Sequence, residues 1–341
     1  LRPSEDRDPG SAIPDPRSAK LFLGIDGGQT GTQALIVDHE GRVLGRGEGG
    51  PSNHVEAPGG RERLRAAILD STGAALRDAG LGTVEATTFD AAYCAMTGEA
   101  DFKTEIITPL LRTRVLRVEH DAPAALAGGT LGEPGIIVVA GTGSVVYGEN
   151  AAGQTARVGG WGYVFGDEGS GFGLARDAIR AALDALDGVG PDTALVPVLS
   201  RYFGVDDLRP LPMVMYNGHL TRDGIAAAAR EVLATWQAGD AVATSVVGAG
   251  LDALARRVRS VATRLDMAAS QVCLSGGVFR SEPYAEAFAR AVRRLVPDAD
   301  VRPARSTPAT GAVLLALRAG GVTLNATIRA HVLATVSEDR S

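Results

Sequence analysis

The sequence is poor in cysteine, in aromatic residues and in long hydrophobic runs. Only Cys94 and Cys273 occur, and each lies inside an apolar stretch, AAYCAM or QVCLSG. Both are therefore predicted to be buried small hydrophobic side chains rather than a disulfide, which favours a reducing, cytoplasmic location. No uninterrupted apolar segment approaches the ~20 residues that cross a bilayer, so we expect no membrane partner.

Positive charge is not concentrated anywhere along the chain. Lys and Arg number 34 against 40 Asp and Glu, a formal net charge of −6, and the two signs are interspersed. Because no basic stripe with interleaved aromatic residues is present, we expect no nucleic-acid partner. Hydrophobic residues make up 45% of the chain and glycines number 44. This composition is ordinary for an α/β enzyme with a sizeable core.

The length of 341 residues indicates two domains, since one hydrophobic core seldom serves so long a chain. Residues 1–19 carry four Pro and mixed charge without an apolar segment, which predicts a disordered leader rather than a signal peptide. An N-terminal domain is expected over 20–131 and a C-terminal domain over 132–325, with a tail at 326–341. The helix predicted at 307–319 can pack back on the N-terminal domain.

Both halves of the chain begin with the same order of elements. Strands are predicted at 21–26, 32–38 and 42–47, joined by glycine-rich turns, which describes an antiparallel meander. The same order returns with strands at 136–140, 145–149 and 154–158. After each meander, predicted helices and buried strands alternate. Such an internal repeat predicts two duplicated α/β domains.

Ala-rich segments with helical periodicity lie in the second half. They predict helices at 169–186, 222–238 and 240–265. A strand at 271–276 ends in Ser-Gly-Gly and is followed by a helix at 279–296. This half therefore continues as βα units after its meander.

Each meander contains a Gly/Thr turn between two predicted strands. The first is GIDGGQTGT at 24–32 and the second is GTGS at 141–144. Because glycine has no Cβ, a phosphate oxygen can approach the backbone N–H groups of such a turn closely. One glycine turn is often only structural. Two equivalent turns in duplicated domains can instead clamp one polyphosphate from both sides of a central cleft.

Asp26 stands at the carboxyl end of the strand that leads into the first turn. A carboxylate beside a phosphate site is repulsive unless a cation lies between them. Mg²⁺ resolves this conflict, because it accepts one carboxylate together with phosphate oxygens and waters. The alternative is a turn-capping role, in which Asp26 hydrogen-bonds its own backbone.

Five stretches follow one another in an order that points to a family. They are GIDGGQTGT (24–32), SNH (52–54), DAPAAL (121–126), GTGS with GGWGYVFGDEGS (141–144 and 159–170), and LSGGVFRS (274–281). In this order they resemble the N-acetylglucosamine kinase branch of the BadF/BadG/BcrA/BcrD ATPase family, within the actin, sugar kinase and Hsp70 superfamily. The resemblance spans most of residues 20–320. It implies two duplicated ribonuclease H-like (actin-like ATPase) domains with a central cleft.

The resemblance also implies an ATP site with Mg²⁺. Thr30 and Thr142 would lie at the ATP phosphates, Asp26 near Mg²⁺, and Ala226 in the wall of the nucleotide pocket. The residues implied at the nucleotide are Gly27, Gly28, Gln29, Thr30, Gly141, Thr142, Gly143 and Ala226, with Gly276 and Gly277 beside the adenosine.

An amino sugar is the second ligand that the resemblance implies. The residues implied at the sugar are Asn53, Asp121, Gly160, Trp161, Gly162 and Asp167. Amide and carboxylate side chains match the paired hydroxyls of a hexose, and an indole can cover its apolar face. Asp121 would accept the proton of the attacking hydroxyl, since a loose phosphoryl-transfer transition state needs little proton abstraction early in the reaction.

Each of these side chains also has a purely structural interpretation. Asp121 precedes Ala-Pro and an Ala/Leu run, so it can be a helix N-cap. Asp167 and Glu168 precede a predicted helix and can complement its dipole. Asn53 lies in a turn, where Asn is common for backbone reasons. Trp161 can serve domain packing.

The function implied is ATP-dependent phosphorylation of N-acetylglucosamine to N-acetylglucosamine 6-phosphate. Glucosamine is an alternative substrate, and so is N-acetylmuramic acid, although no Arg is evidently placed for its carboxylate. An alternative of another class is the ATPase activator of radical acyl-CoA reductases and dehydratases, but Cys94 and Cys273 lack the setting for its iron–sulfur cluster. An actin-like filament protein is compatible with the fold. A homodimer is open, because related enzymes are often dimers.

Overall fold

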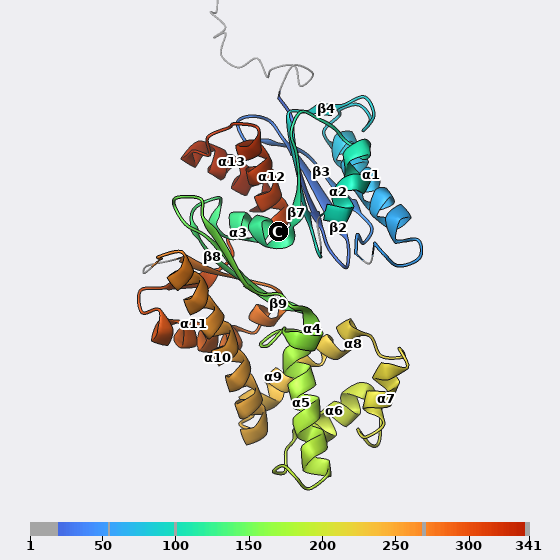
Figure 1. Ribbon diagram of the computed structural model, residues 1–341, viewed down its shortest axis with the longest axis vertical. Coiled ribbons are helices and arrows are strands. Elements are labelled where there is room, and N and C mark those ends of the chain that lie inside the picture. Colours follow the sequence, from blue (N-terminus) through green and yellow to red (C-terminus); the bar gives the residue numbers. More distant parts are fainter. Residues whose placement is uncertain (1–19, 54, 99–100, 268–270, 338–341) are drawn as a thin grey trace, which may run out of the picture. The chain divides into compact units, whose positions relative to one another are not determined.

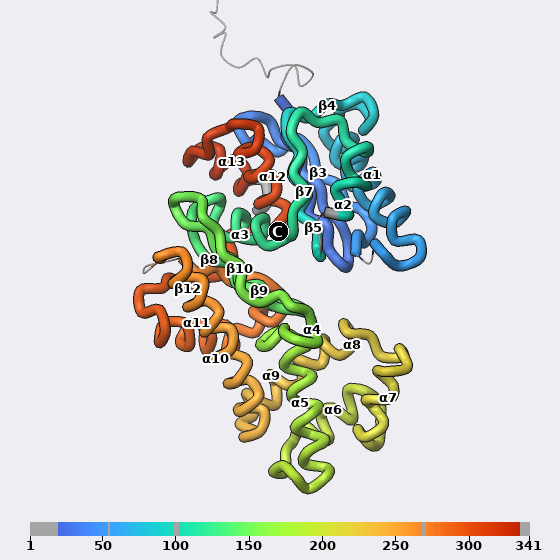
Figure 2. Tube along the Cα trace, viewed as in Figure 1, coloured from blue at the N-terminus to red at the C-terminus, as the bar shows by residue number. Residues whose placement is uncertain are grey.

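The computed structural model describes residues 20–53, 55–98, 101–267 and 271–337. His54 of the SNH stretch and the predicted leader lie outside the described residues. The chain divides into two compact units (Figures 1 and 2). Unit 1 takes the chain up to His120 and again from Ala312 onward, and unit 2 is the continuous stretch Asp121–Gly311.

Unit 1 is built on a five-stranded sheet in the order β3-β2-β1-β5-β7. Its strands are β1 (Phe22–Gly27), β2 (Thr32–Val37), β3 (Val43–Gly49), β5 (Ala91–Met96) and β7 (Leu116–His120). The first three strands form the antiparallel meander predicted from the sequence, and the other two extend the sheet from β1 in parallel. A separate short pair joins β4 (Thr88–Phe89) to β6 (Arg112–Thr113) in parallel.

Helices cover both faces of the unit 1 sheet (Figure 1). α1 (Gly60–Asp78) lies close against β3, because Gly47 has no side chain there: a Cβ on it would stand 2.0 Å from the carbonyl oxygen of Ser71. On the other face, Gly24 makes room for α12 (Pro308–Ala319), with the nitrogen of Val313 2.3 Å from its ideal Cβ position. The remaining helices of unit 1 are α2 (Asp101–Ile107), the 3-10 helix η1 (Thr108–Leu110) and α13 (Ala326–Ser337).

α13 lies in the segment 326–341 that the sequence predicts as a tail. Its residues Ile328 and Val332 are buried, and they pack where a Cβ on Gly41 would stand 2.9 Å from Ile328 Cγ2 and 3.1 Å from Val332 Cγ2. The ring of His331 lies 2.8 Å, through Nδ1, from the carbonyl oxygen of Glu40. This helix therefore completes unit 1 at the turn between β2 and β3.

Unit 2 repeats the same sheet in the order β10-β9-β8-β11-β12. Its strands are β8 (Gly135–Ala140), β9 (Ser144–Glu149), β10 (Thr155–Gly159), β11 (Gln271–Ser275) and β12 (Asp300–Pro303). Again the first three strands are antiparallel and the last two run parallel to β8. The equal strand order confirms the predicted duplication of the α/β domain.

Helices also lie on both faces of this second sheet (Figure 1). Ile137 of β8 faces α3 (Asp121–Thr130), whereas its neighbours Ile136 and Val138 belong to the larger core on the other side. On that side lie α10 (Ala241–Arg264), the 3-10 helix η2 (Gly277–Arg280) and α11 (Glu282–Leu295).

In chain order, a group of helices follows β10 and precedes α10. They are α4 (Gly162–Phe165), α5 (Gly171–Leu186), α6 (Leu195–Phe203), α7 (Leu211–Tyr216), α8 (Arg222–Ala227) and α9 (Ala229–Gln237). The single helix predicted at 222–238 is thus two helices. The break is a tighter turn in which the Ala228 N–H donates to the carbonyl of Ile225 at 3.0 Å. No Gly or Pro marks this position, so the Ala-rich sequence gives no sign of it.

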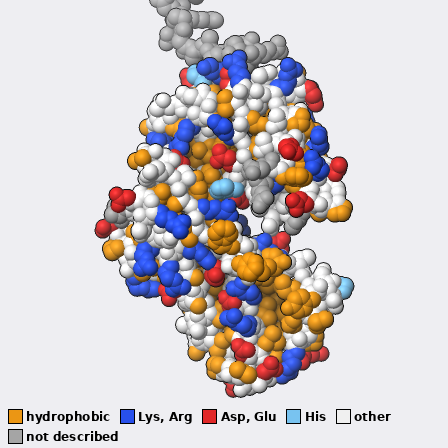
Figure 3. Space-filling model, viewed as in Figure 1, with side chains coloured by type: hydrophobic (Ala, Val, Ile, Leu, Met, Phe, Trp, Pro, Cys, Tyr) orange, Lys and Arg blue, Asp and Glu red, His pale blue; other side chains and the backbone are white. Residues whose placement is uncertain are grey.

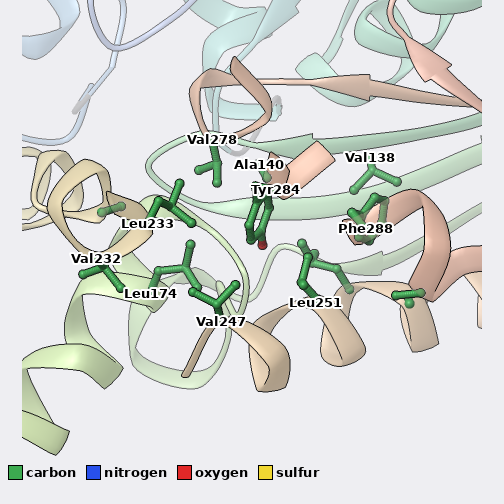
Figure 4. Close-up of a cluster of buried hydrophobic side chains, with 14 of the residues drawn as sticks. Val138, Ala140, Leu174, Val232, Leu233, Val247, Leu251, Val278, Tyr284 and Phe288 are labelled. Carbon is green, nitrogen blue, oxygen red and sulfur yellow. The ribbon is translucent and has the colours of Figure 1, made fainter. Parts of the chain in front are cut away.

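The main core of unit 2 lies between β8 and the helices α5, α9, α10 and α11 (Figure 4). Tyr284 of α11 is fully buried there, and its hydroxyl donates to the carbonyl of Gly169 at 2.9 Å. Burial raises the pKa of Tyr284 well above its usual range, so the hydroxyl stays protonated. This bond ties the loop before α5 to the core.

Both cysteines are free and buried, as predicted. Burial raises the pKa of the Cys94 thiol to about 12, which keeps it protonated and unreactive. Cys273 donates its S–H to the carbonyl of Gly129 at 3.3 Å. None of the helices that the structure describes is long and apolar enough to cross a membrane.

Candidate active site

The first glycine turn joins β1 to β2 in unit 1. The Gly28 N–H donates to the carbonyl of Gly31 at 2.9 Å, and the Ser52 N–H donates to the carbonyl of Gly28 at 3.1 Å. A Cβ on Gly28 would lie 3.4 Å from its nearest neighbour, the carbonyl oxygen of Gly31, so the outer side of Gly28 is open. Thr30 is exposed and Asp26 is half-buried. The turn therefore keeps space beside its backbone, as a phosphate cradle requires.

The loop after β3 brings Asn53 to this turn, since Asn53 directly follows the Ser52 that hydrogen-bonds it. On the inner side Gly27 is tightly packed: a Cβ there would lie 2.6 Å from Ser52 Oγ and 2.7 Å from Met96 Sδ. The predicted site residues that unit 1 brings together are Asp26, Gly27, Gly28, Gln29, Thr30 and Asn53.

The second glycine turn joins β8 to β9 in unit 2. The Gly141 N–H donates to the carbonyl of Gly143 at 3.0 Å, and the carbonyl of Gly141 accepts from the Gly171 N–H at 2.8 Å. The first turn of α5 therefore holds the glycine turn through its backbone. The Thr142 hydroxyl donates to Asp223 Oδ1 at 2.9 Å. Nothing lies within 4 Å of a Cβ placed on Gly141, so this turn is open as well.

Asp167 ties the second turn to the loop between β10 and α5. Its side chain is 3% exposed, and its Oδ1 accepts the Ser144 N–H at 2.9 Å. Its Oδ2 pairs with Arg222 Nη2 at 2.7 Å. The backbone φ of Asp167 is 63°, a left-handed value that non-glycine residues seldom adopt. Ser170 caps α5 by accepting the Gly173 N–H at 3.1 Å.

Glu168 is fixed on the other side of the same loop. Its carboxylate pairs with Arg257 of α10, and its carbonyl accepts the Ser144 hydroxyl at 3.0 Å. Burial by itself raises the pKa of Glu168, but hydrogen bonds from Arg257 and from its own backbone, with the Arg257 charge, outweigh burial and lower the pKa below its ordinary value. Glu168 therefore stays ionised near neutral pH.

Gly160, Trp161 and Gly162 lie beside the second turn. The Gly160 N–H donates to the carbonyl of Ser144 at 3.1 Å. Both glycines have left-handed φ values, 72° and 76°, and the indole between them is 75% exposed. Core packing within unit 2 therefore does not explain Trp161. The next residues form α4, and Tyr163, whose side chain is 44% exposed, extends the apolar surface.

Hydrophobic side chains gather over this helical part of unit 2 (Figure 3). A hollow of about 330 Å³ opens among α4, α5, α7 and α8, with Tyr163, Phe172, Arg176 and Tyr216 in its walls. None of the site residues predicted from sequence lines this hollow.

Ala226, Gly276 and Gly277 lie in unit 2 with the second turn. Ala226 is buried in α8, and its carbonyl oxygen would stand 3.0 Å from a Cβ on Gly171. Gly276 has a φ of 106°, and a Cβ there would lie 2.3 Å from the carbonyl oxygen of Ala140, immediately before the turn. Gly277 is exposed, with open space around it.

Asp121 is the first residue of α3 and of unit 2, whereas Asn53 belongs to unit 1. Asp121 is half-buried in the first turn of the helix. The predicted site residues that unit 2 carries are Asp121, Gly141, Thr142, Gly143, Gly160, Trp161, Gly162, Asp167, Ala226, Gly276 and Gly277.

Sequence reasoning missed Arg222 and Asp223, which begin α8. Arg222 contacts Asp167, which lies 55 positions earlier in the chain. Asp223 contacts Thr142, which lies 81 positions earlier. A charged pair at the start of a predicted helix is common, and no spacing rule links residues so far apart. Only the fold reveals these contacts.

Comparison with known proteins identifies the family that carries these motifs. The model of the BadF/BadG/BcrA/BcrD ATPase family matches residues 23–316. The chain belongs to this family. Within it, the chain is 32% identical over 307 residues to a protein of Clostridium acetobutylicum named N-acetylmuramic acid/N-acetylglucosamine kinase, covering 87% of this chain and 98% of the relative. An N-acetyl-D-glucosamine kinase of Dictyostelium discoideum is 28% identical over 317 residues, covering 88% and 98%.

Solved structures agree with the fold of the family. One is a protein of Chromobacterium violaceum that has been named provisionally as an N-acetylglucosamine kinase. It superposes with a TM-score of 0.69 at 28% identity, covering 88% of this chain and 99% of that one. The ROK hexokinase of Thermus thermophilus superposes with a TM-score of 0.54 at 21% identity, covering 87% and 97%. The predicted fold class, duplicated actin-like ATPase domains, is thereby confirmed.

Proposed function

We propose that this protein is an ATP-dependent amino sugar kinase that converts N-acetylglucosamine to N-acetylglucosamine 6-phosphate. The observation that carries the proposal is the pair of open glycine turns at equivalent places in two duplicated sheets. The exposed Trp161 beside the second turn adds a surface suited to a sugar ring. The kinase names of the relatives from Clostridium and Dictyostelium support the same reaction.

The nucleotide is proposed to bind through both glycine turns. Thr30 and Thr142 would contact the phosphates, while Gly276, Gly277 and Ala226 would lie near the adenosine. Support comes from the open space at Gly28 and Gly141 and from the place of Gly276 immediately beside the second turn. Backbone N–H groups freed of side-chain obstruction are the usual partners of phosphate oxygens.

The residues of the first turn fit Mg²⁺. Asp26 is half-buried at the end of β1, and the turn that follows it is open on its outer side. Mg²⁺ needs only one or two protein carboxylates when phosphates and waters complete its shell. When bound, the ion would neutralise negative charge on the phosphoryl group. Asp26 is therefore proposed as its protein ligand.

The sugar is proposed to bind through Asn53, Asp121, Asp167 and the Gly160-Trp161-Gly162 segment. Asp167 already accepts from the Ser144 N–H and from Arg222. A carboxylate has about four lone-pair sites, so Asp167 keeps capacity for a sugar hydroxyl.

Asp121 would orient the attacking hydroxyl and accept its proton. In phosphoryl transfer most of the catalysis is positioning and charge stabilisation, and the base acts late. The place of Asp121 at the start of α3, on the element that follows the last strand of the unit 1 sheet, fixes its backbone. This role is compatible with its position as a helix-starting residue.

Two other amino sugars are tested alongside N-acetylglucosamine. The Clostridium relative is named for N-acetylmuramic acid as well, and a Vibrio cholerae relative named glucosamine kinase is 28% identical over 189 residues, covering 62% of that protein. The activator of radical enzymes is not favoured, because both cysteines are buried. A homodimer and a cytoplasmic location stay predictions.

The test is release of ADP from Mg-ATP, measured with N-acetylglucosamine, glucosamine, N-acetylmuramic acid, N-acetylmannosamine, glucose and no sugar. We expect the largest kcat/KM with N-acetylglucosamine, and the product should carry phosphate on the 6-hydroxyl by NMR. ATP hydrolysis independent of sugar, or no ADP release with any compound, would contradict the kinase.

A further inference from the structure

Arg222, the first residue of α8, contacts three parts of unit 2. Its Nη2 donates to Asp167 Oδ2 at 2.7 Å and lies 2.7 Å from the place where a Cβ on Gly143 would stand. Its guanidinium lies over the rings of Tyr163 and Phe172, 5.5 Å and 6.0 Å from their centroids. Arg222 therefore stands where the second glycine turn, the sugar-candidate loop and α5 meet.

The ion pair holds the second turn through Ser144. Asp167 is almost fully buried, so its charge has lost water and depends on Arg222 for compensation. The other oxygen of the same carboxylate accepts the Ser144 N–H. If Arg222 is removed, Asp167 is left as a buried charge with one neutral donor. The carboxylate must then move toward water, and this movement alters its bond to the turn.

A second residue of α8 reaches the same turn. Asp223 accepts the Thr142 hydroxyl at 2.9 Å. Two consecutive residues thus hold the turn at two places, Arg222 indirectly at Ser144 and Asp223 directly at Thr142. The position of α8 and the conformation of the turn are coupled by these contacts.

The surroundings of Arg222 include two features that lower the stability of the folded protein. Its Nε is buried and has no hydrogen-bond partner among the described residues, which is unfavourable for folding. Asp167 is also held at a strained φ of 63°. Local violations that persist together in this way are typical of functional sites.

We propose that Arg222 is a positioning residue for the ATP phosphates. By holding Asp167 against the Ser144 N–H, it keeps the 141–144 turn in its phosphate-binding conformation. The inference rests on the proposed function, because it takes this turn as part of the nucleotide site. Arg222 itself acts through Asp167 and does not take part in the chemical step.

The experiment compares Arg222→Met, Arg222→Lys and the double variant Arg222→Met/Asp167→Asn. Nucleotide affinity is measured without sugar, by titration with Mg-ATP and a fluorescent ATP analogue, and thermal unfolding is recorded for each protein. We expect Arg222→Met to raise the nucleotide Kd at least about tenfold, since small misplacements of binding groups have effects of this size. Lys keeps the charge but not the planar fork, so it should recover part of the affinity.

The double variant separates positioning from stability. Asn tolerates a left-handed φ and removes the buried charge, so the unfolding temperature should return toward that of the unmodified protein. The nucleotide Kd should stay raised, because the fixed ion pair is still missing. If Arg222→Met or the double variant binds nucleotide as well as the unmodified protein, the inference is wrong and Arg222 has only a structural role.

Arg176→Met is the matched control. Arg176 donates to the carbonyl of Tyr163 at 3.3 Å and pairs with Asp177 at 3.0 Å, near the same aromatic rings but without a hydrogen bond to the 141–144 turn. Its nucleotide Kd should match that of the unmodified protein, and an equal loss would overturn the specific role of Arg222. If the unmodified protein binds nucleotide but phosphorylates no sugar, the proposed function fails while the Kd comparison still tests this inference.

Discussion

The two glycine turns occupy equivalent places in two sheets of equal strand order, but different contacts hold them. In unit 1, the turn is fixed by backbone hydrogen bonds between Gly28, Gly31 and Ser52. In unit 2, carboxylates do part of this work, with Asp167 on the Ser144 N–H and Asp223 on the Thr142 hydroxyl. The backbone plan is repeated, whereas the side chains around it are not. The second turn should therefore be sensitive to single charge changes at Asp167 and Asp223.

The largest expected effect is a loss of turnover from a substitution at Asp121, which lies in neither glycine turn. This substitution distinguishes a role in the chemical step from a role in binding. Asp121→Asn should lower kcat by at least ~10², because it removes the proposed general base. The affinities for nucleotide and sugar should stay within a fewfold, since Asn keeps the shape of the side chain and one acceptor oxygen. Steady-state kinetics together with direct titration measures both. Near-normal turnover would leave Asp121 with only its structural role at the start of α3.

The inner glycines of the two turns should respond unequally to a methyl group. Gly143→Ala would place Cβ 2.7 Å from Arg222 Nη2 and 2.9 Å from Asp167 Oδ1, so it must displace the ion pair. We expect a loss of about 1–3 kcal/mol in the free energy of unfolding.

Gly27→Ala meets Ser52 and the flexible Met96 instead and should cost less. Urea unfolding of both variants measures the difference. Equal losses in the free energy of unfolding would show that the ion pair is displaced as easily as a methionine side chain. The two turns would then not differ in this respect.

The outer glycines form a matched pair that tests what the turns share. A Cβ on Gly28 would lie no closer than 3.4 Å to its nearest neighbour, and one on Gly141 has none within 4 Å. Ala at either place should change the free energy of unfolding by no more than about 0.5 kcal/mol. Each should weaken nucleotide binding about tenfold, because the new methyl group occupies the space of a phosphate oxygen. A variant that binds Mg-ATP normally would remove its turn from the nucleotide site.

The smallest expected effect concerns the acid sensitivity of the loop around the second turn. Because the pKa of Glu168 is lowered in the folded protein, the unfolded chain binds more protons in the window below the ordinary Glu value of 4.5. The stabilisation is therefore complete above that value and disappears as the pH falls through the lowered pKa. It should not exceed about 1 kcal/mol, because the side chain is 37% exposed and water screens the pair.

Glu168→Gln measures this contribution. The difference in unfolding free energy between this variant and the unmodified protein should shrink from pH 6 to pH 3. A difference that stays constant with pH would mean that the Glu168–Arg257 pair does not contribute through its charge.

Sequence reasoning predicted the features that depend on neighbours in the chain. The meander at 21–47 and its repeat at 136–158 followed from alternating apolar residues and glycine turns, and the structure confirms both within a residue or two. The break between α8 and α9 escaped prediction, because Ala228 is compatible with a continuous helix. The contact between Arg222 and Asp167 escaped for a different reason, since it depends on how α8 folds back on the loop before α5.

The candidate site likewise has features that neighbours in the chain predict and features that only the fold reveals. The glycine turns, Asp26 and Trp161 could be selected because backbone chemistry and local spacing single them out. The open space at Gly28 and Gly141, by contrast, became measurable only with neighbouring atoms in place. The assignment of Asp121 as a base still depends on the family resemblance and on the kinetic test.

The discontinuity of unit 1 has a consequence for synthesis of the chain. Its first strand, β1, packs through Gly24 against Val313 of α12, almost 300 positions later. Unit 2 is a single uninterrupted stretch and can fold as soon as it leaves the ribosome. The first strands to emerge must instead wait for the last helices before one face of their sheet is covered. During translation that face stays exposed until the last helices of the unit are made, and exposed apolar surface of this kind makes a nascent chain prone to aggregation.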